Sequence, residues 1–325
     1  MKVLVTSASP DSVNSNAVLR EFVGSGFSGL LTEKNVFCCS LDYAVEAVKF
    51  YRPDLIVVFG SCMPDCCDYT SLRNYCIKGS AEMVFWLHDD PYEFDYNYKI
   101  FNYANYIFSN DKWAVIHMDH PRVFHLPLAA SEKTHYRPIR TEFERDLFFC
   151  GVCFSNRRQL LLDYSNDLSE FNFEVFGADW PISLAFCKNS RISNESLPDY
   201  YAHSIATLNL GRRFNLANNK YQLDPTTPGP RTFEAAMAGA VQCYHYVTPE
   251  IFDYFNNNEI LIFDSVQELK DILLRLINDI SYRNRIAFAS QSRALKDHTY
   301  VNRAQYIMNT VGVPFEALRP SPAMT

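Results

Sequence analysis

Short apolar segments recur along the chain at intervals long enough to hold a helix, and this alternation limits the possible fold more than any other feature. The first half contains five such strand-like runs, at residues 2–6, 54–60, 82–88, 106–109 and 123–126. The run at 54–60 is continuous in apolar residues after its first position and closes on glycine, as expected for a strand buried on both faces. Residues 41–51 carry apolar side chains at helical spacing. The first half therefore predicts a parallel sheet with helices on both faces.

The same alternation begins again after a polar and charged segment at residues 129–145. Strand-like runs follow at 146–151, 173–177, 206–210, 241–247 and 259–263. A helix is expected at 156–168, and Ser265 and Glu268 have the spacing of a capping box before a long amphipathic helix. Two α/β halves joined by a polar segment predict two Rossmann-like domains whose parallel sheets face a cleft. We expect an N-terminal domain at 1–135, a C-terminal domain at 136–308 and a C-terminal tail at 309–325.

Composition excludes some classes of protein. No apolar run reaches the 18 residues of a membrane span, and the chain opens on a strand-like segment without the pattern of a signal peptide. We therefore expect a cytoplasmic protein. The net charge of −7 argues against a general nucleic-acid surface, although it does not exclude a local basic cleft.

The ten cysteines are most simply explained as buried reduced thiols, because several lie inside apolar, strand-like runs. The alternative is metal or redox chemistry at Cys150 and Cys153, which have the C-x-x-C spacing of a zinc half-site or a redox pair. A second C-x-x-C pair is missing from the sequence, which favours structural thiols.

The segment from Pro228 to Gly239 is typical of a loop followed by a short helix, with Arg231 in the first turn and Glu234 one turn further on. A helix start offers N–H groups and a partial positive charge, and an arginine adds a fork that suits a phosphate. A glutamate three residues later can accept hydrogen bonds from sugar hydroxyls. The pair therefore indicates a site for a ribose diphosphate. The alternative is a surface ion pair on a helix that begins at proline.

Residues at the ends of the strands in the second half are further candidates, because ligands of open α/β sheets bind at the carboxyl ends of strands. Gly151, Gly177, Asn209 and Arg213 occupy such positions, and Arg157 follows Gly151 at the expected start of a helix. Arg157 could reach a phosphate or lie at a solvated helix end. The sequence contains neither a G-x-G-x-x-G fingerprint nor a P-loop motif.

One strand-like run of the first half ends at His88 and is followed by Asp89, Asp90 and a proline. A histidine or carboxylate there could act as a general base on an acceptor hydroxyl. Asp89 and Asp90 could instead hold a divalent metal, or the segment could be a structural turn. The loop at 7–11 lacks glycine, which makes it a poor phosphate cradle, but it could touch an acceptor.

Residues 145–308 resemble the C-terminal domain of GT-B glycosyltransferases, in particular the CgeB-like branch of the group-1 superfamily. The matching pieces, in the family's order, are 146–151 with Arg157, 176–177, 200–202 running to 208–210, 230–239, 259–264 and 298–300 with Arg303. In the first half, residues 86–91 resemble the Asp-Asp-Pro segment of that branch.

The resemblance implies a nucleotide-sugar donor bound mainly by the C-terminal domain, an acceptor bound mainly by the N-terminal domain, and no essential metal or other cofactor. Arg231 would contact the diphosphate and Glu234 the ribose. The expected donor-binding set is Gly151, Arg157, Gly177, Asn209, Arg213, Arg231, Thr232, Phe233 and Glu234. The chain departs from the family at one position. Many retaining relatives have a second glutamate eight positions before the one that corresponds to Glu234, and the present chain has Thr226 there. The stereochemistry is therefore left open.

Together these features predict a metal-independent glycosyltransferase that moves a sugar from a nucleoside diphosphate-sugar to a hydroxyl-bearing acceptor, such as a glycan or a small molecule. His88, Asp89 and Asp90 are the candidates for the base if the enzyme inverts. Two alternatives remain: a metal-dependent glycosyltransferase that uses Asp89 and Asp90, and a non-catalytic protein that binds nucleotide-sugars.

Overall fold

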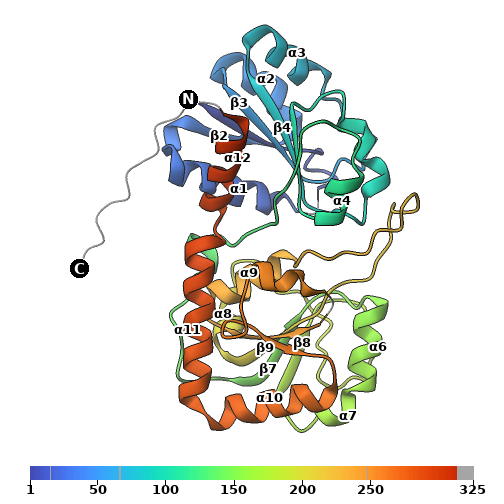
Figure 1. Ribbon diagram of the computed structural model, residues 1–325, viewed down its shortest axis with the longest axis vertical. Coiled ribbons are helices and arrows are strands. Elements are labelled where there is room, and N and C mark those ends of the chain that lie inside the picture. The colour runs from blue at the N-terminus through green and yellow to red at the C-terminus, as the bar shows by residue number, and fades with distance from the viewer. Residues whose placement is uncertain (15, 66, 247, 313–325) are drawn as a thin grey trace, which may run out of the picture. The chain divides into compact units, whose positions relative to one another are not determined.

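The computed structural model describes residues 1–14, 16–65, 67–246 and 248–312 (Figure 1). It divides into two compact units, each built on one parallel sheet. The N-terminal unit contains Met1–Leu128, Asn215–Pro225 and the chain from Tyr300 onward, and the C-terminal unit contains Ala129–Phe214 and Thr226–Thr299. Within the described ranges, no helix is long and apolar enough to cross a membrane.

The N-terminal unit has six parallel strands in the order β2-β1-β3-β4-β5-β6. The strands are β1 (Val3–Ser7), β2 (Val36–Cys39), β3 (Leu55–Phe59), β4 (Glu82–Leu87), β5 (Tyr106–Ser109) and β6 (Val123–His125). The helices are α1 (Ala17–Leu30), α2 (Leu41–Tyr51), α3 (Thr70–Gly79), α4 (Lys112–His117) and α12 (Tyr300–Val311), with 3-10 turns η1 (Glu33–Asn35) and η2 (Phe94–Ile100). The predicted strands of this half are confirmed, and α2 has the predicted bounds. All five residues of β1 and of β3 are buried, as their apolar runs require.

The C-terminal unit has five parallel strands in the order β11-β10-β9-β7-β8. The strands are β7 (Arg145–Cys150), β8 (Phe173–Phe176), β9 (Ser204–Asn209), β10 (Val241–His245) and β11 (Leu261–Phe263). The helices are α5 (Glu132–His135), α6 (Ser155–Asp163), α7 (Ser165–Leu168), α8 (Leu197–Ala202), α9 (Pro230–Met237), α10 (Val266–Asn278) and α11 (Ile280–Asp297), with the 3-10 turn η3 (Pro249–Asp253). The helix expected at 156–168 is present as α6 followed by α7.

The predicted capping box at the start of α10 is confirmed. Ser265 Oγ accepts a hydrogen bond from the Glu268 backbone N–H at 3.3 Å, and Glu268 Oε2 accepts one from the Ser265 N–H at 3.2 Å. The apolar face that follows buries Leu269, Leu273 and Leu276 against the sheet. Local sequence therefore sets both the start of this helix and the face that it buries.

The last helix belongs with the N-terminal unit, because α12 packs against α1. Gly26 on α1 makes this close approach possible, since a Cβ there would lie 2.4 Å from the carbonyl oxygen of Tyr300. Arg303 on α12 donates hydrogen bonds to the carbonyl oxygens of Pro127 (2.9 Å) and Leu128 (3.1 Å). This division differs from the expected boundary at 308, and α12 continues to Val311, inside the expected tail. Residues 313–325 of that tail lie outside the described residues.

Part of the long connection between β9 and α9 also returns to the N-terminal unit. The Ala217 N–H donates to the Tyr92 carbonyl oxygen at 2.8 Å, and the Asp95 N–H donates to the Ala217 carbonyl oxygen at 2.8 Å. The Asp95 carboxylate accepts from the Asn219 N–H at 2.6 Å. These hydrogen bonds hold residues 215–225 next to the segment that follows His88.

Candidate functional site

Strand order places a switch point in the C-terminal unit between β7 and β9, because the chain continues from β7 to one side and returns to the other. Ligands of open α/β sheets bind at the carboxyl ends of strands at such a point. Arg157 of α6 lies there. Its Nε donates to the carbonyl oxygen of Gly211 at 3.1 Å, and its Nη2 donates to that of Leu210 at 2.8 Å, both after β9. Its Nη1 donates to the carbonyl oxygen of Val152, after β7, at 3.2 Å. Arg157 thus ties together the two loops that border the switch point.

The two glycines predicted at strand ends serve close backbone packing. Gly177 has φ +145°, and a Cβ there would lie 1.9 Å from the carbonyl oxygen of Gly151. A Cβ at Gly151 would lie 2.8 Å from Arg157 Nη1. The same Gly151 carbonyl accepts a hydrogen bond from Trp180 Nε1 at 3.0 Å. Glycine at both positions lets the ends of β7 and β8 and the Arg157 side chain meet.

Helix α9 carries the predicted cation and carboxylate. It begins at Pro230 after Gly229, and Arg231 Nη1 lies 2.7 Å from Glu234 Oε2. The arginine side chain is 43% exposed, whereas that of Glu234 is only 4% exposed. Burial acts to lower the pKa of Arg231, but the charge and hydrogen bond of Glu234 together with the nearby Tyr201 and Cys150 outweigh it, and the pKa is raised overall. The pair therefore presents a permanently charged guanidinium above a buried carboxylate.

Three hydrogen bonds under this helix join Asn209, Thr232 and Gln242 to one another. Asn209 Nδ2 donates to Thr232 Oγ1 at 2.8 Å and to Gln242 Oε1 at 2.9 Å, and Gln242 Nε2 donates to the Thr232 carbonyl oxygen at 2.9 Å. Thr232 and Phe233 are fully buried, and Phe233 packs in the core with Phe255. Side-chain burial favours a packing role for Thr232 and Phe233, two of the residues expected to bind the donor.

The charged pair of α9 acts on titratable groups of two neighbouring elements. Burial raises the pKa of the Cys150 thiol at the end of β7, while Arg231 and Arg157 act to lower it and Glu234 acts to raise it. Burial likewise raises the pKa of Tyr201 on α8, and the same Arg231 and Glu234 charges act on it. The charges of Arg157, Arg231 and Glu234 therefore all act on the thiol at the end of β7. Arg213 is exposed, and its backbone N–H donates to Asn156 Oδ1 at 2.9 Å.

The N-terminal unit has its own switch point between β1 and β3. The Ala8 N–H donates to the Phe59 carbonyl oxygen at 2.8 Å, which joins the ends of these two strands. Gly60 follows with φ +130°, and a Cβ there would lie 3.6 Å from His88 Nε2 and 3.7 Å from the Ala8 Cβ. The loops after β1, β3 and β4 therefore meet at one edge of the sheet, and His88 lies at that edge.

The three candidates for the base occupy different environments. His88 is buried, and its Nδ1 lies 2.9 Å from Oδ2 of Asp89, whose side chain is 20% exposed. Asp90 is 3% exposed, and its two carboxylate oxygens accept hydrogen bonds from Asn97 Nδ2 (2.8 Å) and Ser109 Oγ (2.6 Å). Burial raises the pKa of Asp90 to about 7, against the lowering effect of these hydrogen bonds. Asp90 is thus a buried member of a hydrogen-bond network, and Asp89 is the more accessible carboxylate.

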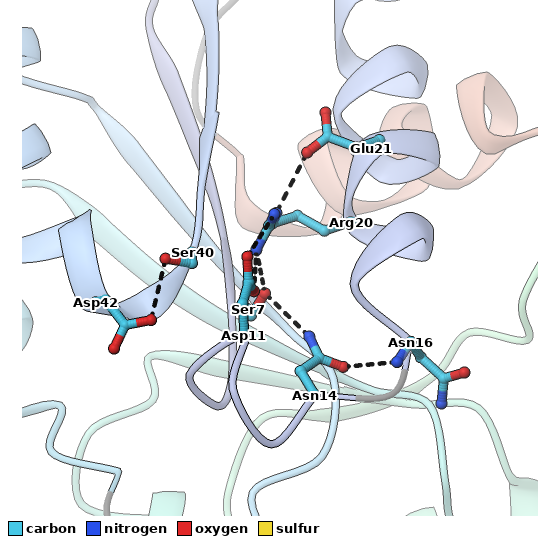
Figure 2. Close-up of polar contacts among 8 residues, drawn as sticks. All are labelled: Ser7, Asp11, Asn14, Asn16, Arg20, Glu21, Ser40 and Asp42. Atoms are coloured by element: carbon cyan, nitrogen blue, oxygen red, sulfur yellow. Dashed lines mark hydrogen bonds and ion pairs between the residues drawn. The ribbon is translucent and has the colours of Figure 1, made fainter.

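An arginine that the sequence analysis did not single out holds the loop after β1 (Figure 2). Arg20 Nη1 donates to Ser7 Oγ and to Asp11 Oδ1, both at 2.7 Å, and its Nη2 donates to Asp11 Oδ2 at 3.2 Å. Asn14 Nδ2 donates to the same Ser7 oxygen at 3.2 Å. Figure 2 shows these side chains converging from the loop and from α1. A forked arginine on the first turn of the helix is the only local signal that could have pointed to this network.

Eight described cysteines are free thiols: Cys38, Cys39, Cys62, Cys76, Cys150, Cys153, Cys187 and Cys243. Burial raises the pKa of both Cys150 and Cys153, so both are held as thiols rather than the thiolates that redox or metal chemistry uses. Among the residues with described positions, no group of three or more His, Cys, Asp or Glu side chains is arranged to hold a metal ion.

Comparison with known proteins adds two findings. Residues 157–309 match a family described as glycosyl transferase-like. No curated protein sequence matches the chain.

Solved structures match almost the whole chain at low sequence identity. Anabaena HepE in complex with UDP and glucose has a TM-score of 0.62 at 12% identity, covering 96% of this chain and 99% of that one. A DNA-modifying β-glucosyltransferase, determined with and without its substrate uridine diphosphoglucose, has a TM-score of 0.63 at 14% identity, covering 96% and 100%. Phage T4 BGT in complex with UDP and Mn²⁺ has a TM-score of 0.60 at 12% identity, also covering 96% and 100%.

The predicted fold class is confirmed, because two Rossmann-like units with parallel sheets match GT-B structures over their full length. The glycosyl transferase-like segment begins at Arg157 and includes α9. The expectation of a glycosyltransferase is confirmed by this segment within a chain of the GT-B fold.

Proposed function

We propose that this glycosyltransferase moves a sugar from a nucleoside diphosphate-sugar, with UDP as the first nucleotide to test, to a hydroxyl-bearing acceptor. The observation that carries the proposal is the pairing of Arg231 with buried Glu234 at the start of α9, at the carboxyl-end edge of its sheet. The choice of UDP is supported by the UDP and uridine diphosphoglucose complexes of the structural neighbours.

The C-terminal unit would hold the donor. A guanidinium has five N–H donors, and the contact with Glu234 uses one terminal nitrogen of Arg231, so the fork can also bind a diphosphate. As the bond to the sugar breaks, negative charge grows on the diphosphate, and a fixed cation at a helix start stabilises it. The Glu234 carboxylate would accept hydrogen bonds from the ribose hydroxyls. Arg157 would act by fixing the loops after β7 and β9 that border this position.

The N-terminal unit would activate the acceptor if the reaction inverts the anomeric carbon. The acceptor oxygen forms the new bond to that carbon, the bond from the carbon to the diphosphate oxygen breaks, and the hydroxyl proton passes to a base. Asp89 suits this task best, because its carboxylate is partly exposed and is paired with His88, whereas Asp90 is buried with both oxygens hydrogen-bonded. In a retaining reaction the departing phosphate would take the proton instead.

We propose that the transfer needs no metal and no other cofactor. The metal-dependent alternative requires Asp89 and Asp90 to coordinate one ion. Asp90 does not fit this role, because its oxygens are buried and already accept hydrogen bonds from Asn97 and Ser109. The T4 BGT complex contains both UDP and Mn²⁺, so metal dependence needs a direct test. Full turnover with a chelator present supports the proposal, and loss of turnover restored by Mn²⁺ or Mg²⁺ contradicts it.

Two finer assignments accompany this function. Membership of the CgeB-like branch is supported by the order of the motifs from Asp146 to Arg303. A cytoplasmic location is supported by the eight free cysteines, since reducing compartments preserve thiols.

Calorimetric titration with nucleoside diphosphates and a sugar-hydrolysis assay together test the function. Binding of a diphosphate with slow release of sugar from the matching donor is the expected result. Binding without any turnover favours the non-catalytic alternative, and no binding to any of the common nucleoside diphosphates overturns the proposal. A thermal-shift screen finds the preferred base first, because a bound ligand raises apparent stability by mass action.

A further inference from the structure

A buried histidine far away in the sequence lies against the carboxylate of Glu234. His135 ends α5, its side chain is 2% exposed, and α5 packs on α9 within the C-terminal unit. His135 Nε2 lies 3.8 Å from Glu234 Oε1. The other carboxylate oxygen, Oε2, is the one that pairs with Arg231 at 2.7 Å. Glu234 therefore has a cation beside one carboxylate oxygen and an imidazole nitrogen 3.8 Å from the other.

The backbone fixes which ring nitrogen of His135 carries the proton. The Ser131 N–H donates a hydrogen bond to His135 Nδ1 at 2.9 Å, so Nδ1 acts as the acceptor. The proton of the neutral ring is then on Nε2, the nitrogen nearest Glu234. Burial lowers the pKa of His135, and although Glu234 acts to raise it, the shift is downward overall. The ring thus offers Glu234 an N–H dipole without adding a second full charge.

We propose that His135 is a positioning residue that orients the Glu234 carboxylate for the ribose of a bound nucleotide. This inference rests on the proposed function. Each carboxylate oxygen has two lone pairs, so contacts with His135 and Arg231 leave acceptor capacity for both ribose hydroxyls. Without the N–H at Nε2, the carboxylate keeps its contact with Arg231, whose own side chain is 43% exposed. Recognition of the ribose then weakens, while the cation that binds the diphosphate stays in place.

Two substitutions separate this role from simple filling of space. His135→Asn keeps an acceptor near the place of Nδ1 for the Ser131 N–H but removes the donor that faces Glu234. His135→Gln keeps an N–H near the place of Nε2 but loses the acceptor for Ser131. The positioning role therefore predicts that His135→Asn loses the preference for a ribonucleotide and that His135→Gln keeps it. A purely structural role predicts instead that nucleotide binding by both variants changes only as the stability of the fold changes.

The readout is the preference for a ribonucleotide, which a structural role does not change. Dissociation constants are measured by calorimetry for UDP and 2′-deoxy-UDP, or for the best-bound nucleoside diphosphate and its deoxy counterpart. The wild-type protein is compared with His135→Asn, His135→Gln, Glu234→Gln and the double variant His135→Asn/Glu234→Gln. Melting temperatures of all five proteins are recorded in parallel.

We expect the wild-type protein to prefer UDP by about tenfold or more, as one or two hydrogen bonds to a charged group allow. His135→Asn and Glu234→Gln lose most of this preference, His135→Gln keeps it, and the double variant is no worse than Glu234→Gln alone. An unchanged preference in folded His135→Asn, or additive losses in the double variant, overturns the inference. If His135→Asn does not fold, loss of the preference in folded His135→Gln overturns it equally.

The same measurements distinguish this failure from failure of the proposed function. A wild-type protein that binds none of the diphosphates overturns the function and, with it, the role of His135. Tight binding with a preference that survives Glu234→Gln removes the ribose contact from Glu234 and also overturns the inference. A ribonucleotide preference that depends on Glu234 but not on His135 overturns only the inference about His135 and leaves the proposed function intact.

Discussion

The guanidinium of Arg231 and the carboxylate of Glu234 lie 2.7 Å apart, yet the first side chain is 43% exposed and the second only 4%. A pair with this asymmetry differs from an ordinary surface ion pair, because the buried carboxylate fixes the cation while the cation still faces outward. A cation held in this way at the start of α9 can bind an anion without first having to be ordered.

Arg231→Ala should weaken binding of the preferred nucleoside diphosphate strongly. Loss of a charge-assisted contact is worth about 2 kcal/mol, or roughly 30-fold in the dissociation constant. Arg231→Lys is the matched control, because it keeps the charge but loses the planar fork, and it should retain intermediate affinity. Calorimetry measures both variants. Unchanged affinity in Arg231→Ala would remove this residue from the site.

Arg157 should matter for stability as well as for activity. Arg157→Gln loses most of the hydrogen bonds to the carbonyl oxygens of Val152, Leu210 and Gly211, and we expect the free energy of unfolding to fall by about 2 kcal/mol. Arg158→Gln changes an exposed neighbour on the same helix and should alter stability by less than about 0.5 kcal/mol. Chemical denaturation of the two variants checks the difference. Equal stability would show that the carbonyl contacts of Arg157 contribute little.

The sequence contained enough local information to predict both sheets and the α9 pair. Buried strands are visible as apolar runs, and Arg231 and Glu234 are three residues apart, so helical periodicity alone brings them together. Arg157 was placed correctly at the start of a helix, but its partners are backbone carbonyls, which sequence patterns do not reveal.

Contacts between distant segments could not be predicted in this way. His135 lies against Glu234 only because α5 packs on α9, and α12 joins the N-terminal unit through its contact with Gly26 on α1. The burial of Asp90 has the same origin, since Asn97 and Ser109 approach it from η2 and β5. Each of these depends on tertiary packing, which leaves no periodic signal in the chain.

Asp90 should make stability depend on pH in a specific direction. Its pKa is raised by burial to about 7 in the folded protein, above the usual value of about 3.9 in an unfolded chain. Between these values the folded state binds more protons than the unfolded state, so the free energy of unfolding falls as pH rises from about 4 to about 7. Asp90→Asn removes this contribution.

Chemical denaturation at pH 5 and pH 7.5 measures the effect as the difference between the wild-type protein and Asp90→Asn. The wild-type protein should lose more stability than the variant over this interval. Glu142→Gln, at an exposed position, is the control and should follow the wild-type protein. A steeper loss in Asp90→Asn than in the wild-type protein would contradict the raised pKa.

Substitutions at Asp89 and at Asp90 should have different effects on turnover. Asp89→Asn removes the accessible carboxylate but keeps an oxygen beside His88 Nδ1, so we expect turnover to fall by about 100-fold or more while diphosphate affinity stays unchanged. Asp90→Asn keeps a partner for Ser109 or Asn97 and should retain most of the turnover at a temperature where the variant is folded. Steady-state kinetics with the preferred donor measure both. Full activity in Asp89→Asn would exclude this carboxylate as the base and favour a reaction in which the leaving phosphate accepts the proton. A folded but inactive Asp90→Asn would instead indicate that the buried carboxylate is the base.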